Sequence, residues 1–586
     1  MRRSTEILIL VVILAAAAWL RFRGLDWGLP QPYHPDEGSI LFHSLAFGTG
    51  DLNPHWFRWP SFLMYVMFGV YGGYYLLGRL VGTFGAPVDL LRGYLTDLSP
   101  FWLMGRWVSA LAGVATVWVT YRIGRRAFDA FVGLVAALFM AVVYLHVRDS
   151  HYATPDVVTT FLAALSLLAA VRALDSGRVG DLVLSGFLAG LAASTKYPGV
   201  LAAAGTLAAY IHLATSRKVP VSSLFAAAGA CAAGFVVGTP YSVLSYQEFA
   251  RDVTTQLTMV STTGVEHAAT SFAAGLREVF AGSVGRGVGY PILALAVLGV
   301  FLRRGRVAES AGRRISVVAA YAAAVFAVMI AITVKRSTYL TPALPAMALL
   351  AAAGVEGLGG LLARPLKAPR HVLAVTLAVL VALVAVIPSV RFGTALAAED
   401  TRTQAARWIE ANVPPGAVVA VEDYGPVLNL SVEQLSALVD LDSTAVGAWE
   451  APQRRLNELR LEVGRAREPQ FVVYGIGCGP SPFRLPRAYE DASALIASVE
   501  RLGAEFVVLS SKAVEWRRME GAANRADAEA CAFRDWVVEN GALRERFVAE
   551  THTPPIDRGD GRSFHNPVIE VFEISRTAGP SNREGL

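Results

Sequence analysis

The chain has 586 residues, of which 54% are hydrophobic and only 17% are charged, and its mean hydropathy is +0.45. This balance is far from that of a soluble globular protein and indicates a membrane protein. The formal net charge of +5 says little as a total, because the positions of Lys and Arg relative to the apolar segments carry the information. The sequence also disfavours a soluble nucleotide-sugar enzyme, since "GIGCGP" at 475–480 lacks the spacing of a phosphate loop and is interpreted as a turn.

Apolar runs of about membrane-spanning length predict roughly eleven transmembrane helices. Their expected positions are 5–20, 102–120, 128–146, 157–172, 182–195, 197–214, 221–239, 288–302, 315–334, 338–360 and 371–390. With a cytoplasmic N-terminus, the arginine-rich loops all face the cytoplasm, as the positive-inside rule requires. The loops at 21–100, 147–156 and 240–287 are then outside, as is everything after about residue 391. The first run also has features of a signal peptide, whose removal would leave these sides unchanged.

The run from Trp59 to Leu80 is long enough to cross, but a crossing there would turn the later arginine clusters outward. Its Trp and Tyr content suits the membrane interface. We therefore predict that it lies along or dips into the interface, with a true span as the alternative.

From Glu399 onward, charge rises and strand-like runs at 471–475 and 505–511 alternate with helical stretches such as 400–412. This pattern predicts a transmembrane core over residues 1–390 and a soluble, extracytoplasmic α/β domain over 391–586. Cys478 and Cys531 of this domain would pair only in an oxidising compartment, whereas Cys231 is expected to be a packing residue.

The motif "HPDEG" follows the first apolar run and contains His34, Asp36 and Glu37. It fits a helix start, with Pro35 at the first helical position and both acids in the first turn, where they face the positive end of the helix dipole. Successive helical residues point about 100° apart, so the two carboxylates cannot share one task. One is expected to face a cavity while the other holds structure or a cation. Ionisable groups at this depth are functional candidates.

The second outside loop, "VRDSHYATPDV" at 147–157, has the same form. Thr154 is expected to cap the next helix, Pro155 to open it and Asp156 to lie in its first turn, which accounts for this acid without a function. Arg148, His151 and Tyr152 remain as candidates.

Two further outside elements carry cations. Lys196, followed by Tyr197, sits between two apolar runs, where it could simply extend its amine to the interface. Lys335 and Arg336, close to Tyr339, break the positive-inside pattern, which an anionic ligand would explain. Transfer from a lipid phosphate needs such a set: a carboxylate that takes a proton from an acceptor hydroxyl, and cations that stabilise the departing phosphate.

Several motifs together resemble a known family: "HPDEG", "WFRWPSFLMY", "RDSHYATPDVVTTF", "GLAASTKYPG" and "RSTYLTPALPAMALLAA". Their order resembles the GT-C glycosyltransferases of the protein-O-mannosyltransferase and aminoarabinose-transferase type (glycosyltransferase family 39-like), with bacterial proteins carrying an RgtA-like domain as the nearest subset. The resemblance covers residues 1 to about 390 and implies the GT-C fold.

The resemblance implies a polyprenyl-phosphate-sugar donor, an acceptor at the outer face of the cytoplasmic membrane and inversion at the anomeric carbon. The acceptor is a protein, lipid or glycan, and nucleic acid is not expected as a partner. The family's base carries over to Asp36, with Glu37 beside it, and its phosphate-binding cations carry over to Arg336 and Lys196. His151 and Asp156 match the second-loop pattern and are expected to bind sugar or a cation. We predict no metal or other cofactor, although relatives differ in their use of divalent cations.

Two other functions would fit part of this pattern. A transporter or flippase of a lipid-linked glycan would also use many spans with buried charges, but the sequence has no internal duplication and its charged positions gather at one membrane face. A catalytically inactive scaffold that presents the C-terminal domain is disfavoured by the retained acids and bases.

Overall fold

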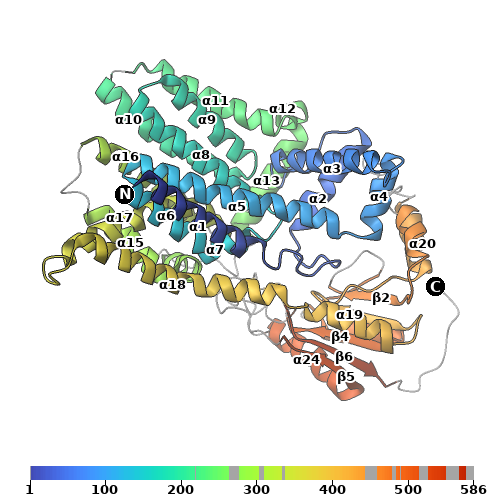
Figure 1. Ribbon diagram of the computed structural model, residues 1–586. Coiled ribbons are helices and arrows are strands. Elements are labelled where there is room, and N and C mark those ends of the chain that lie inside the picture. The colour runs from blue at the N-terminus through green and yellow to red at the C-terminus, as the bar shows by residue number, and fades with distance from the viewer. Residues whose placement is uncertain are drawn as a thin grey trace. The chain divides into compact units, whose positions relative to one another are not determined.

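A computed structural model describes residues 2–217, 219–262, 276–302, 309–332, 337–442, 458–477, 483–488, 490–511, 513, 525–549 and 566–575. The chain forms two compact units, whose elements are labelled in Figure 1. Unit 1 comprises Met1–Leu25, His34–Val81 and Phe101–Thr394. Unit 2 comprises Asp26–Tyr33, Gly82–Pro100 and Ala395–Leu586. Two N-terminal segments are therefore grouped with the C-terminal residues, which a single boundary near residue 390 does not anticipate.

Unit 1 is built from helices. Its α-helices are α1 (Arg3–Phe22), α2 (Glu37–Ala46), α3 (Phe62–Leu80), α5 (Ser99–Ala127), α6 (Ala130–Val142), α7 (Tyr144–Asp149), α8 (Pro155–Ser176), α9 (Val179–Ala193), α10 (Ala203–Arg217), α11 (Ser222–Gly238), α12 (Tyr241–Leu244), α13 (Tyr246–Thr262), α15 (Tyr290–Leu302), α16 (Glu309–Ala331), α17 (Leu344–Leu362) and α18 (Arg370–Ala397). Short 3-10 segments η1 (Phe47–Thr49), η2 (Tyr197–Ala202) and η4 (Ser337–Ala343) and a π-helix, η3 (Glu278–Gly289), connect them.

Seven helical segments in the described part of the chain are long and apolar enough to cross a membrane. They are Arg3–Phe22, Ser99–Ala127, Pro155–Ser176, Tyr197–Ser216, Gly312–Ala331, Ser337–Leu362 and Arg370–Asn412. Four further apolar helices, at Ala130–Val142, Val179–Ala193, Ser222–Gly238 and Gly287–Phe301, are shorter. The chain is a multi-pass membrane protein, while the expected number of eleven spans stays a prediction. Helix α3 is not among the seven, and its placement at the interface also stays a prediction.

Close helix packing in unit 1 depends on glycine. A Cβ atom on Gly190 of α9 would lie 2.0 Å from the carbonyl oxygen of Cys231 in α11. Gly299 of α15 and Gly354 of α17 face each other's helix backbone in the same way: a Cβ atom added to either would lie 2.0 Å from the carbonyl oxygen of Leu350 or of Leu295, respectively. Helices in membranes gain most of their association energy from such close contact, because lipid offers no hydrophobic driving force between them.

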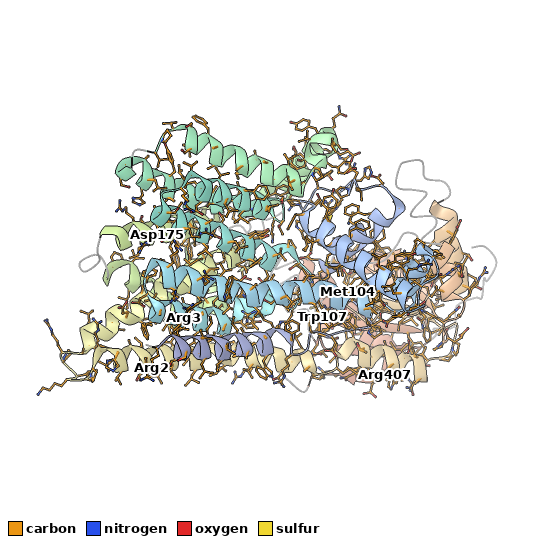
Figure 2. All side chains as sticks on the ribbon, turned by 45° about the horizontal axis from the view of Figure 1, so that its top comes forward. Arg2, Arg3, Met104, Trp107, Asp175 and Arg407 are labelled. Atoms are coloured by element: carbon orange, nitrogen blue, oxygen red, sulfur yellow. The ribbon has the colours of Figure 1, made fainter. Side chains whose placement is uncertain are left out.

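One end of the unit 1 bundle carries ion pairs that join separate helices. Asp175 at the end of α8 accepts from Arg126 Nε at 2.6 Å and from Arg314 Nη2 at 2.5 Å. Glu6 of α1 pairs with Arg125 Nε at 2.6 Å. Figure 2 shows Asp175 at the same end of the bundle as Arg3, while Met104 near the start of α5 lies toward the other end. Three of the arginines that the sequence analysis placed in the cytoplasm, Arg125, Arg126 and Arg314, therefore take part in these ion pairs.

Unit 2 contains a six-stranded sheet in the order β3-β2-β1-β4-β6-β5. Its strands are β1 (Val418–Glu422), β2 (Val472–Ile476), β3 (Arg484–Leu485), β4 (Phe506–Ser510), β5 (Gly541–Phe547) and β6 (Ile569–Ile574). The first four run parallel, and β6 pairs antiparallel with β4 and β5. The strand-like runs at 471–475 and 505–511 thus form β2 and β4, as predicted.

Helices cover both faces of this sheet, and the alternation of strand side chains explains how. In the described part of unit 2 the helices are α4 (Pro87–Thr96), α19 (Thr401–Asn412), α20 (Val432–Asp442), α22 (Ala492–Arg501) and α24 (Arg525–Asn540). Val419 and Val421 of β1 point into one core together with Ile409 of α19. Ala420 points into the opposite core, against Leu495 of α22. Cys531 lies exposed on α24 as a free thiol, and Cys478 is outside the described residues.

Candidate functional site

The first outside loop leads into α2, which begins at Glu37 with Asp36 at the N-cap position. The expected start at Pro35 is therefore wrong by two residues. The physical reason is local: the His34 ring nitrogen Nδ1 accepts the backbone N–H of Asp36 at 3.3 Å, so the chain makes a turn before the helix begins. Of the two acids, only Glu37 lies in the first helical turn.

Glu37 is completely buried and its carboxylate is fully engaged. Arg106 of α5 donates to it in bidentate fashion, with Nε to Oε1 at 2.8 Å and Nη2 to Oε2 at 2.9 Å. The backbone N–H of Ala153 donates to Oε1 at 2.8 Å. Burial by itself would raise the pKa of Glu37, but the charge and hydrogen bonds of Arg106 outweigh it and hold the pKa below its ordinary value. Glu37 is thus a fixed anion that joins α2, α5 and the second loop.

Asp36 differs from Glu37 both in its burial and in the contacts of its carboxylate. It is only half-buried. Its carboxylate makes no hydrogen bond or ion pair with any residue that the structure describes, and it does not cap α2. Of the two adjacent acids, Asp36 alone has a carboxylate available to accept a proton from a bound molecule.

The second outside loop lies directly against the first. The rings of His34 and Tyr152 are stacked at a tilt with centroids 4.2 Å apart. Helix α8 begins at Pro155 with Thr154 at its N-cap position and Asp156 in its first turn, as predicted, although the Thr154 side chain makes no capping hydrogen bond.

His151 is buried below this surface. Its Nδ1 lies 2.8 Å from the carbonyl oxygen of Val147 and its Nε2 lies 3.1 Å from that of Arg23. Two carbonyl partners would suit a doubly protonated ring, but burial lowers the pKa of His151 to about 4. We assign a neutral ring with the proton on Nδ1, where the contact is shorter. His151 thus contacts two backbone carbonyl groups, and its expected binding of sugar or a cation stays a prediction.

Lys196 contacts the second outside loop and η4. Its Nζ is 2.6 Å from Asp156 Oδ1, and it lies 5.3 Å from the centroid of the Tyr339 ring in η4. The side chains of Lys196 and Asp156 are 14% and 6% exposed, so this pair is largely shielded from water. The hydroxyl of the neighbouring Tyr197 donates to the carbonyl oxygen of Phe57 at 2.6 Å. This hydrogen bond connects the segment that contains Lys196 to the first loop.

A third ion pair lies within the second loop and is connected to η4 by hydrogen bonds. Arg148 and Asp149 are 1% and 2% exposed and pair at 2.9 Å. Arg148 Nη2 donates to Ser337 Oγ at 3.2 Å, and the Thr341 hydroxyl donates to Asp149 Oδ2 at 2.8 Å. Arg148 is therefore hydrogen-bonded to the first residue of η4. Lys335 and Arg336, which precede it, lie outside the described residues.

The four outside elements of the sequence analysis thus contact one another at one end of the unit 1 bundle. The distance between this site and the arginine-rich end follows from the rise per residue of the α-helices that join them. Arg106 and Arg126 are twenty residues apart on α5, or about 30 Å, which is about the thickness of a hydrocarbon core. Asp156 and Asp175, near the two ends of α8, give a similar separation of about 28 Å.

Sequence reasoning missed two residues that organise this site. Arg106 is a lone arginine within an apolar span, a signal that by itself marks a functional position in a membrane protein. Asp149 lies inside a recognised motif, but nothing in its local sequence shows that it pairs with η4. No group of three or more His, Cys, Asp or Glu side chains in the described ranges could hold a metal ion, and the expectation of a metal-independent reaction stays a prediction.

Comparison with known proteins bears on this site. Residues 100–262 match the sequence model of the dolichyl-phosphate-mannose-protein mannosyltransferase family. The matched segment contains Arg106, the second outside loop and Lys196, and it confirms the resemblance to GT-C glycosyltransferases. No curated protein matches the chain.

Solved structures of the same kind are similar at low identity. ArnT from Cupriavidus metallidurans bound to undecaprenyl phosphate is 14% identical, with a TM-score of 0.46 over 99% of this chain and 100% of that one. The oligosaccharyltransferase of Archaeoglobus fulgidus is 13% identical, with a TM-score of 0.45 over 94% and 74%. The S. cerevisiae protein O-mannosyltransferase Pmt1-Pmt2 complex bound to the sugar donor is 20% identical, with a TM-score of 0.30 over 42% and 35%.

Proposed function

We propose that this protein is a membrane glycosyltransferase that moves a sugar from a polyprenyl-phosphate donor to an acceptor hydroxyl, with Asp36 as the general base. The observation that carries the proposal is the contrast between two adjacent acids: Glu37 is held by Arg106, whereas the Asp36 carboxylate has no partner in the described part of the chain. The family match over residues 100–262 supports sugar transfer from a lipid-linked donor.

The reaction is a single displacement. Asp36 takes the proton from the acceptor hydroxyl as its oxygen forms a bond to the anomeric carbon. The bond from that carbon to the phosphate oxygen breaks, and the electron pair leaves with the polyprenyl phosphate. Attack from the face opposite the phosphate inverts the anomeric carbon.

The departing phosphate needs a cation. Lys196 is a described cation at the junction of the outside elements, and Asp156 and the Tyr339 ring hold its ammonium in place. A group fixed in this way stabilises developing charge without reorganising during the reaction. Lys335 and Arg336 remain candidates for the same role on the evidence of the sequence.

We place the reaction at the outer face of the cytoplasmic membrane. The positive-inside rule assigns the arginine-rich end of α5 and α8 to the cytoplasm. The site lies about 30 Å along α5 from that end. This orientation also places unit 2 residues after α18 outside, and the acceptor is then a protein, lipid or glycan of the cell envelope.

The test is transfer from radiolabelled polyprenyl-phosphate sugars in proteoliposomes that contain the full chain. Asp36→Asn should lower kcat by about 10²–10⁴-fold while donor binding persists, because only the proton acceptor is lost. Asp26→Asn, an exposed acid of the same outside loop, serves as the matched control and should transfer at the wild-type rate. Wild-type kcat in Asp36→Asn would exclude Asp36 as the base, and donor movement across the bilayer without transfer would favour a flippase.

A further inference from the structure

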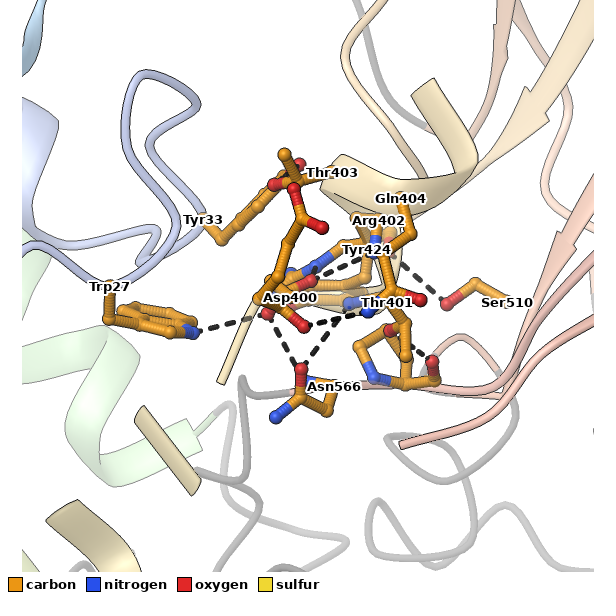
Figure 3. A network of polar contacts seen from close by, with 12 residues as sticks. Trp27, Tyr33, Asp400, Thr401, Arg402, Thr403, Gln404, Tyr424, Ser510 and Asn566 are labelled. Carbon is orange, nitrogen blue, oxygen red and sulfur yellow. Dashed lines mark hydrogen bonds and ion pairs between the residues drawn. The ribbon is translucent and has the colours of Figure 1, made fainter. Parts of the chain in front are cut away.

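Residues Asp26–Tyr33 lie between α1 and α2 in the sequence, yet they fold as part of unit 2. Two aromatic side chains contribute to this attachment. Trp27 is 3% exposed and Tyr33 is 6% exposed. Figure 3 shows both of them beside residues at the start of α19. The two rings are thus buried, and their polar atoms contact residues more than 360 positions away in the sequence.

The residues that receive these rings form a buried ion pair. Asp400, the N-cap residue of α19, accepts from Arg402 through both oxygens at 2.8 Å. It also accepts the backbone N–H groups of Arg402 at 2.9 Å and of Asn566 at 3.1 Å. Asp400 and Arg402 are each 1% exposed. Taking such a pair out of water costs several kcal/mol per ion before their attraction repays it, so stability alone is a weak reason to retain it.

The side chains of Trp27 and Tyr33 pack against this ion pair. The Arg402 guanidinium carbon lies 3.7 Å from the centroid of the Tyr33 ring and 5.8 Å from that of Trp27. The Trp27 indole N–H donates to Asp400 Oδ2 at 3.1 Å. The Tyr33 hydroxyl lies 3.1 Å from Thr403 Oγ1. Arg402 thus presents its flat face to Tyr33 while its edge is bound by Asp400, a geometry that lysine cannot reproduce.

The same loop is fixed at its two ends by one residue of unit 1. Arg106 donates Nη1 to the carbonyl oxygen of Leu25 at 2.9 Å and binds Glu37 with its other nitrogens. The loop between Leu25 and Glu37 therefore has both ends attached to Arg106 and its middle attached to the Asp400–Arg402 pair. Asp36 comes three residues after Tyr33 and one before Glu37, so both attachments restrict where its carboxylate lies.

We propose that Arg402 is a positioning residue for sugar transfer: by binding Trp27 and Tyr33 it sets the conformation of the loop that carries Asp36. The catalytic part of this inference rests on the proposed function, whereas the attachment of the loop does not. A displacement of about 1 Å at a reacting group can lower a rate by about 10²-fold, so loss of this attachment would be visible in kcat.

The experiment perturbs the attachment from both sides in the full chain in proteoliposomes. Tyr33→Leu removes the ring from the loop, and Arg402→Lys keeps the charge but loses the planar face. Tyr33→Phe keeps the ring and is the conservative variant. Arg407→Lys is the matched control, because this arginine lies on the same helix in an exposed pair with Glu399.

Two readouts are measured on each variant. Hydrogen exchange of peptides within 26–36 should accelerate at least about tenfold in Tyr33→Leu and Arg402→Lys, while peptides of β1 and β4 keep their protection. In the transfer assay, kcat should fall about 10–100-fold with the donor KM unchanged, because the loop carries the proposed base and none of the proposed phosphate-binding cations. Tyr33→Phe and Arg407→Lys should behave as the wild type in both.

Three results would overturn the proposal. Unchanged exchange of 26–36 in Tyr33→Leu would show that the ring does not hold the loop. Faster exchange with wild-type kcat would show that the attachment does not position Asp36. Faster exchange that extends to β1 and β4 would reduce Arg402 to a structural residue of unit 2. A wild type without transfer activity would instead refute the proposed function, and the exchange data would still decide whether Arg402 holds the loop.

Discussion

Replacing Glu37 by Gln tests the assignment of the two acids most directly. The structure gives Glu37 three donors, two from Arg106 and one from the Ala153 backbone, all within 2.9 Å. An amide of the same shape removes the negative charge and turns an N–H group toward one of those donors. Arg106, which is 0% exposed, then remains buried without a counter-charge. Breaking one side of a buried ion pair typically costs about 3–5 kcal/mol.

The assay is equilibrium unfolding of the full chain in mixed micelles, followed by Trp fluorescence. The expected loss corresponds to an increase of about 10²–10⁴-fold in the unfolding equilibrium constant. Glu399→Gln breaks the exposed pair with Arg407, whose side chains are 40% and 70% exposed, and should leave stability unchanged. The double variant Glu37→Gln with Arg106→Gln should recover part of the loss, because no unpaired charge remains. A Glu37→Gln protein as stable as the wild type would refute the view of Glu37 as a structural anion and would return it to the list of candidate bases.

Three further predictions concern packing, pH and the phosphate cation. Gly190→Ala should destabilise the protein by at least about 1–3 kcal/mol in the same assay, since its Cβ would meet the Cys231 carbonyl, whereas Gly229→Ala on α11 has no atom within 4 Å and should be neutral or slightly stabilising. The folded-state pKa of His151 is about 4, below the unfolded value of about 6.5. The neutral ring therefore contributes its full stability above pH 6.5, and this contribution is lost as the pH falls toward 4. Unfolding curves should show a loss of up to about 3 kcal/mol in the wild type and no such loss in His151→Gln. Lys196→Met should lower kcat by about 10²–10³-fold in the transfer assay and Lys196→Arg by less, and equal rates for all three proteins would exclude Lys196 from the phosphate site.

Much of this protein could be read from local sequence because the forces concerned are local. Hydropathy over about twenty residues locates a membrane helix, since the bilayer imposes its thickness on each segment separately. Pro155 in the first turn, followed by Asp156, indicated the start of α8 within its own motif. The strands at 471–475 and 505–511 followed from their β-branched and aromatic content.

Only the tertiary structure could distinguish Asp36 from Glu37. Both acids follow the same proline, and each fits a helix start equally well. The difference comes from Arg106, which is 69 residues away in sequence and reaches Glu37 because α2 and α5 pack together. The attachment of Trp27 to Asp400 joins residues 373 apart. Such contacts depend on how helices and loops pack in three dimensions, and no property of a short sequence window encodes which distant side chain will fill a given buried position.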